Sequence, residues 1–157
     1  MVTRARSSQS SAAEVGVPPE DVDFVELLWR AKRTVAERLG AALAEEGASF
    51  DDWRLLSLLQ CGGRSMTELA KATGVPPPTL TKRVDRMVAA NLVHRRTDDS
   101  DRRRVLLLLA PRGRALHDRL LPLVERERER VHRLVQQSAD VAGFAVGLLA
   151  LSAVEPA

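Results

Sequence analysis

Apolar residues recur every three or four positions over most of the chain, a spacing that predicts amphipathic helices. The first such stretch begins at Asp21 and continues to about Ala44, where "EEGASFDD" interrupts it. Ser49 or Asp51 is placed to cap a second helix, and the glycine pair in "CGGR" ends it. The pattern therefore predicts two helices before the middle of the chain.

A short helix and a longer one follow, with only a tight turn between them. Ser65 and Glu68 have the spacing of a capping box, and Gly74 suits a left-handed turn, so we expect a helix over Ser65–Thr73. Pro76–Pro78 cannot continue that helix, but proline is favourable in the first turn of a new one. The result is a helix-turn-helix arrangement.

The second helix of this pair has one apolar and one polar side. The apolar side, which is expected to anchor the helix, consists of Leu80, Val84, Met87 and Val88. The polar side, which is left free to touch a partner, carries Thr79, Lys82, Arg83 and Arg86, with Thr81 nearby.

Two segments after this helix, residues 92–96 and 103–110, read as short strands. The sequence between them, "TDDSD", is dense in turn-forming residues, which predicts a β-hairpin. Five arginines lie near its tip: Arg95, Arg96, Arg102, Arg103 and Arg104. A helix-turn-helix followed by a basic hairpin is a winged helix.

The rest of the chain is expected to be helical. Pro111 opens a stretch that could run to Gln137, and Ser138 could cap a last, almost wholly apolar helix over residues 139–154, which needs a partner surface. The expected fold class is mainly α with a small β-wing. The expected organisation is a flexible tail over 1–18 and one domain over 19–157, with a winged-helix lobe at about 50–110 and a helical dimerisation region at about 20–48 and 111–154.

Charge is concentrated in the middle of the chain. Residues 64–104 contain 10 Lys+Arg and 5 Asp+Glu, a balance of +5, whereas residues 1–63 contain 7 and 10, and residues 105–157 contain 7 and 6. Such a local field suits a polyanion, although a solvated basic face gives the same totals. One cysteine excludes an internal disulfide, and no signal peptide or bilayer-length apolar run is evident, so we expect a soluble cytoplasmic protein without a membrane partner.

In this order of elements the chain resembles the MarR family of winged-helix transcriptional regulators over about residues 20–155. Two segments carry the resemblance, "TLTKRVDRM" in the second helix and "DDSDRRRVLLLLAPRGR" in the wing. The resemblance implies a homodimer built by the first and last helices, a recognition helix in the major groove of double-stranded DNA and a wing in the minor groove. Pro76 and Pro78 stand where the family often has Ser, and Ala110 where it favours Thr; the first departure could change base preference.

The resemblance and the chemistry of the side chains together suggest which residues touch DNA. A forked or extended donor, Lys82 or Arg83, is the candidate to read guanine, and Arg86 to hold phosphate. In the wing, a salt bridge between Asp101 and Arg103 would stiffen the tip and leave Arg102 for the minor groove. The complete set expected to bind DNA is Thr79, Thr81, Lys82, Arg83, Arg86, Arg95, Arg102 and Arg103, each of which could instead be a solvated surface residue.

Family members often release DNA when a small aromatic or anionic effector binds between the dimer helices and the DNA lobe. Candidate effector contacts are Trp29, Arg30, Arg33, Trp53 and His117, each equally explained as a core or surface residue. Two alternatives remain: an oxidant-sensing regulator that uses Cys61, and a winged-helix dimerisation or adaptor module without specific DNA binding. We found no catalytic motif or metal-ligand spacing, so we expect no enzyme, cofactor or metal, and repression is the expected mode of action.

Overall fold

The computed structural model of the protein describes residues 23–137 and 141–153. The expected tail, the proposed cap Ser138 and the last few residues lie outside this part of the chain. The described elements are α1 (Phe24–Glu45), α2 (Phe50–Gln60), β1 (Arg64–Ser65), α3 (Met66–Thr73), α4 (Pro77–Ala89), β2 (Val93–Thr97), β3 (Val105–Leu109), α5 (Pro111–Gln136) and α6 (Val141–Ala153). The predicted fold class, mainly α with a small β-wing, is confirmed.

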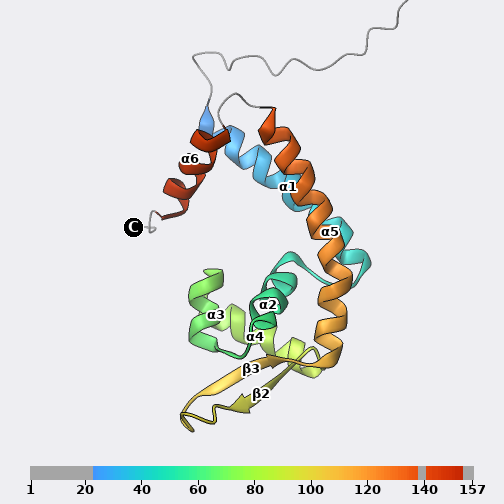
Figure 1. Ribbon diagram of the computed structural model, residues 1–157, viewed down its shortest axis with the longest axis vertical. Helices are drawn as coiled ribbons and strands as arrows, with labels where there is room; N and C mark the ends of the chain where they lie inside the picture. Colours follow the sequence, from blue (N-terminus) through green and yellow to red (C-terminus); the bar gives the residue numbers. More distant parts are fainter. Residues whose placement is uncertain (1–22, 138–140, 154–157) are drawn as a thin grey trace, which may run out of the picture.

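The elements form an arm and a lobe (Figure 1). Helices α1 and α5 pack together along the arm, and the Arg38 guanidinium donates to the Glu127 carboxylate between them at 2.9 Å. Helices α2, α3 and α4 and the three-stranded sheet form the lobe at one end of α5. Helix α6 begins at the other end of the arm, beyond the end of α5.

The helix boundaries follow from side-chain caps that the sequence contains. Ser49, one of the two expected candidates, caps α2 in a capping box with Asp52. The capping box of Ser65 and Glu68 at α3 is confirmed, and Gly74 ends that helix in the left-handed region with a φ of 68°. Helix α4 begins differently, because its N-cap is Pro76 and no side chain caps it.

The sheet has the antiparallel order β1-β3-β2, and His94 pairs with Leu108 in the hairpin. Strand β2 has the expected length but begins one residue later, whereas β3 is shorter than expected, so Arg103 and Arg104 belong to the turn and not to a strand. Strand β1 was not expected, since its two residues, Arg64 and Ser65, show no alternation; their pairing with Leu107 and Leu106 defines them. This extra strand joins the start of α3 to the wing.

One continuous apolar core holds the lobe on the arm. Its most buried side chains come from every helix except α6 and from β3: Leu43, Leu55, Leu56, Leu69, Leu80, Val84, Leu107 and Leu120. Helix α6 contributes nothing to this core. Although it is almost wholly apolar, its side chains Phe144 and Leu149 are 50% and 68% exposed.

Within the described ranges no single helix is long and apolar enough to cross a membrane. Helices α5 and α6 taken together, as one bent pair, meet that requirement by length and composition only.

Candidate nucleic-acid interface

Helix α4 presents a polar face because its opposite face is fixed in the core. Leu80, Val84 and Met87 are at most 3% exposed, so the helix cannot rotate without exposing them. Lys82 and Arg86 lie on the exposed face, and within residues 23–137 and 141–153 neither forms an ion pair. They are therefore available to a partner.

The two threonines of this helix differ. Thr79 is exposed and its hydroxyl has no hydrogen-bond partner among the described residues. The Thr81 hydroxyl instead donates to the Pro77 carbonyl of its own helix at 2.9 Å. Thr79 thus offers a free hydroxyl at the start of α4, whereas Thr81 would have to give up an existing bond.

The structure contradicts the expectation that Arg83 is free to read a base. Its side chain is only 16% exposed and points back to the first turn of α2. There it donates to the Ser49 hydroxyl at 2.8 Å, to the Asp52 carboxylate at 3.0 Å and to the Asp51 carboxylate at 2.9 Å. The physical reason is position: residue 83 borders the buried face of α4, where a long cation meets the acidic start of another helix. Lys82 remains the candidate to read guanine.

Three wing arginines are also engaged within the protein: Arg96 pairs with Asp99 inside the wing at 3.3 Å, and the other two reach the helices. Arg95 donates to the Asp85 carboxylate of α4 at 2.6 Å. Arg104 reaches the Glu68 carboxylate of α3 at 3.2 Å and lies 3.8 Å from that of Asp98. Arg95 is therefore not a free cation. The side chains of Arg95 and Arg104 both hold the wing against the helices.

The expected salt bridge between Asp101 and Arg103 is not formed. The Asp101 carboxylate accepts the backbone N–H of Arg103 at 3.0 Å, an Asx-type turn that uses the main chain. The tip of the wing is ordered by such short-range bonds, since the Asp98 carboxylate likewise accepts from the hydroxyl and the N–H of Ser100. These two bonds hold the pKa of Asp98 below its usual value.

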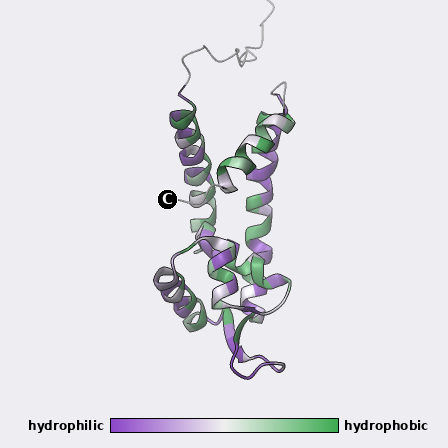
Figure 2. Cartoon of the chain, turned by 90° about the vertical axis from the view of Figure 1, so that its left-hand side faces the viewer, coloured by the Kyte–Doolittle hydropathy of each residue, from purple (hydrophilic) through white to green (hydrophobic). Residues whose placement is uncertain are grey.

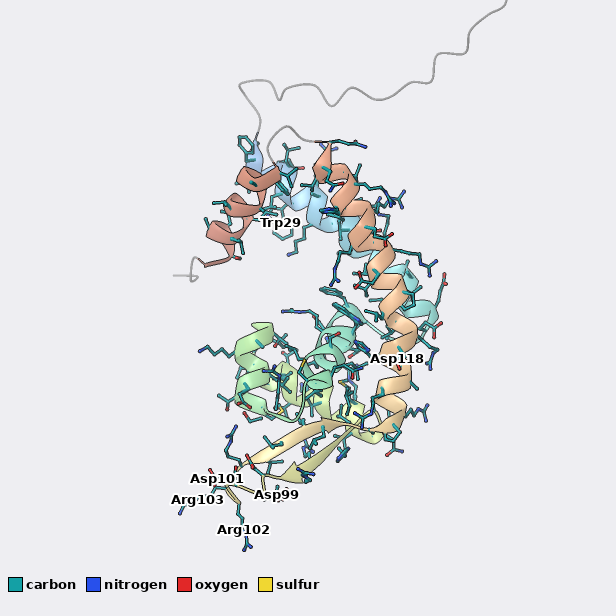
Figure 3. The ribbon with its side chains drawn as sticks, in the orientation of Figure 1. Trp29, Asp99, Asp101, Arg102, Arg103 and Asp118 are labelled. Atoms are coloured by element: carbon teal, nitrogen blue, oxygen red, sulfur yellow. The ribbon has the colours of Figure 1, made fainter. Side chains whose placement is uncertain are left out.

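The guanidinium groups of Arg102 and Arg103 remain without an acidic partner in the described part of the chain. Figure 3 shows both at the tip of the wing, with Arg102 pointing away from the body of the molecule. Figure 2 shows the same tip as the hydrophilic end of the molecule. The candidate interface is thus the exposed face of α4 together with this tip.

The five expected effector residues are not brought together. Trp29 is 61% exposed on α1, with Lys32 Nζ 4.6 Å from its ring centre (Figure 3). Arg30 is also exposed, and Arg33 lies 3.8 Å from Glu37 on the same helix. His117 is buried where α2 meets α5, with its Nδ1 2.8 Å from Gln60 Nε2. These four residues therefore do not form one site.

Trp53 does line a groove, which we call the apolar groove. It has a volume of about 590 Å³ and is bounded by α1, α2, α5 and α6. Phe50 stacks on Trp53 with ring centres 5.5 Å apart, and the other apolar walls include Val131 and Phe144. Arg128 and His132 are polar groups on its border. The sequence pointed to Trp53 but not to Phe50, whose only signal was its place next to the helix cap.

Cys61 is exposed at the end of α2. The described residues contain no cluster of His, Cys, Asp and Glu that could hold a metal ion.

Asp52 has an unusual environment that makes stability depend on pH. Burial raises the pKa of its carboxyl, but hydrogen bonds from the hydroxyl and the N–H of Ser49 and from Arg83 lower it more, so the pKa lies below its ordinary value of 3.8. A carboxyl with a lowered folded-state pKa stabilises the fold above its unfolded-state pKa. This contribution is lost as pH falls below 3.8 through the folded-state pKa.

We therefore expect Asp52→Asn to lower the free energy of unfolding at neutral pH, and the difference from wild type to shrink as pH falls below 3.8. Urea unfolding at several pH values measures it. Asp99→Asn is the control, because that side chain is 88% exposed and should cost little at any pH. A difference between Asp52→Asn and wild type that stays constant down to the acid range would contradict the assignment.

The fold and this interface define a winged-helix protein. Residues 47–104 match the sequence model described as MarR family. The chain is 40% identical over 68 residues to the HTH-type transcriptional repressor NicR of Pseudomonas putida, a match that covers 43% of each chain. The lobe, residues 47–104, is thus similar in sequence to the MarR family.

Solved structures of the same fold extend the likeness beyond the lobe. The CouR repressor bound to a 23-mer DNA duplex is 28% identical, with a TM-score of 0.71, and the alignment covers 84% of this chain and 93% of that one. BpsR of Bordetella bronchiseptica is 24% identical, with a TM-score of 0.73 over 89% of this chain and all of that one, which is a likeness in fold. The likeness therefore extends from the lobe to the arm.

Proposed function

We propose that this chain is a transcriptional regulator that binds a pseudo-palindromic double-stranded DNA site as a homodimer and represses until an effector binds. The observation that carries the proposal is the set of unpaired side chains on one lobe, Thr79, Lys82 and Arg86 on α4 and Arg102 and Arg103 at the wing tip. Arg83, Arg95, Arg96 and Arg104 of the same lobe are paired with acids. The unpaired cations, by contrast, are free to meet phosphates and base edges.

The exposed apolar surface supports a homodimer. Helix α6 carries Phe144, Leu149 and Leu151 with half or more of their surface exposed, and Phe24 at the start of α1 is 74% exposed. Such a patch is unfavourable in water unless another surface covers it. A second copy of the chain supplies the same patch and, by two-fold symmetry, a second DNA lobe.

The apolar groove supports an aromatic effector with an anionic group. Its walls include the stacked rings of Phe50 and Trp53, and Arg128 borders it. Two structurally similar proteins have aromatic ligands. DNA binding by BpsR is regulated by 6-hydroxynicotinic acid, and a crystal structure of CouR from Rhodococcus jostii contains p-coumaroyl-CoA. A ligand that prefers a lobe spacing unsuited to DNA would release the operator.

Selection of bound duplexes from a random pool tests the function. We expect enrichment of two inverted half-sites about 10 base pairs apart, because each lobe of a two-fold dimer reads one major groove. Single-stranded RNA of the same length serves as competitor, and small aromatic acids are then screened for release. If no sequence is enriched, or if RNA competes as well as duplex DNA, the chain acts as an adaptor or RNA-binding module instead.

A further inference from the structure

Arg83 joins the recognition helix to the first turn of α2 through three hydrogen bonds. Its partners are the Ser49 hydroxyl and the carboxylates of Asp51 and Asp52, at 2.8 to 3.0 Å. Its Nε is buried and has no partner among the described residues. Among the described residues, every side-chain hydrogen bond of this largely buried cation therefore goes to the start of another helix.

That turn of α2 has a second face. Phe50 and Trp53, which flank the two aspartates in the sequence, stack on each other and form a wall of the apolar groove. One helical turn thus carries an acidic pair that holds α4 and an aromatic pair that would contact a ligand. The capping box of Ser49 and Asp52 makes this turn a single hydrogen-bonded unit, so a shift of its backbone displaces both pairs together.

We propose that Arg83 is a positioning residue that couples the apolar groove to the recognition helix. Movement of the aromatic wall moves Asp51 and Asp52, and α4 follows because a buried guanidinium left without its carboxylates is costly. Lysine could not replace it fully, since an ammonium lacks the planar fork that spans both carboxylates. The proposal rests on the function proposed above, in which α4 enters the major groove.

The fluorescence of Trp53 tests this coupling from the DNA side. The chain has two tryptophans, so Trp29→Phe leaves Trp53 as the only one. Duplex DNA selected from the random pool is added to saturation, with binding followed separately by gel shift. Because coupling is reciprocal, we expect DNA bound at α4 to change the emission of Trp53 in the groove wall.

In the same background, Arg83→Gln and Asp51→Asn should reduce this emission change to less than half at saturation, and Arg83→Lys should give an intermediate value. Asp51→Asn leaves the capping box of Ser49 and Asp52 intact. A smaller emission change in this variant therefore cannot be explained by a disrupted start of α2. Arg86→Gln is the matched control: it removes an unpaired cation from the same helix, and should weaken DNA binding while the emission change at saturation persists. Urea unfolding identifies any variant that fails to fold.

The outcomes separate the two proposals. An undiminished emission change in both Arg83→Gln and Asp51→Asn would overturn the coupling but leave DNA binding intact, as would a parent protein that binds duplex with no change in Trp53 emission. Failure of the parent to bind any duplex in the gel shift would overturn the proposed function, and the coupling with it.

Discussion

Duplex binding should weaken steeply with salt, by roughly a thousandfold or more between low and moderate ionic strength. Each protomer offers four unpaired cations at the interface, Lys82, Arg86, Arg102 and Arg103, which gives about eight phosphate neutralisations for a dimer. Cations that displace counterions from DNA make the logarithm of affinity fall linearly with the logarithm of salt, by about 0.9 per contact. Fluorescence anisotropy of labelled duplex over a salt series measures the slope.

Removing one of these cations should reduce the slope as well as the affinity. We expect Arg86→Gln to lower the slope by about one per protomer, with similar losses on matched and scrambled sites, because a phosphate contact carries no sequence information. Arg133→Gln is the control, since that residue lies on α5 beyond the lobe and pairs with Glu129. A slope that Arg86→Gln leaves unchanged would remove α4 from the interface.

Gly113→Ala, near the start of α5, should strongly destabilise the fold. A Cβ on Gly113 would lie 2.0 Å from the Leu92 carbonyl oxygen and 3.0 Å from a methyl of Leu109. That carbonyl cannot move freely, because it accepts the Ala110 N–H at 3.0 Å where the wing meets α5. We expect a loss of about 3 kcal/mol in the free energy of unfolding, and a fall in Tm of roughly 6–12 °C for a chain of this size.

Gly40→Ala provides the comparison for this measurement. Gly40 also lies inside a helix, but a Cβ there would meet no atom within 4 Å. Alanine should therefore stabilise α1 by up to about 1 kcal/mol through helix propensity. Thermal unfolding of the two variants side by side distinguishes crowding from a general effect of replacing helical glycine. If Gly113→Ala and wild type have the same Tm, α5 does not approach Leu92 as closely as described here.

Local features of the chain could be predicted because their causes lie within a few residues. The caps at Ser49 and Ser65, the left-handed Gly74 and the apolar side of α4 all follow from short-range rules, and the structure has them. The same rules indicated a hairpin after α4 and a long helix from Pro111.

The pairing of charged side chains could not be predicted in the same way. Arg83 meets Asp51 and Asp52 from more than 30 residues away in the sequence, and helical periodicity places it only near a boundary between faces. Arg95 and Asp85 meet because the hairpin folds back on α4. Basic residues look alike in a sequence. Only the packing of the elements that carry them decides which ones form ion pairs within the protein and which remain free.

The three prolines before α4 decide which groups can approach a phosphate. An ordinary helix begins with four backbone amides that have no partner in the helix and attract anions. Here three of those four positions, Pro76, Pro77 and Pro78, have no N–H at all, and only the amide of Thr79 remains, since Leu80 already donates to the Pro76 carbonyl. Helix α4 therefore has almost no main-chain group left to bind an anion. In the proposed function, it would hold the DNA backbone through its side chains alone.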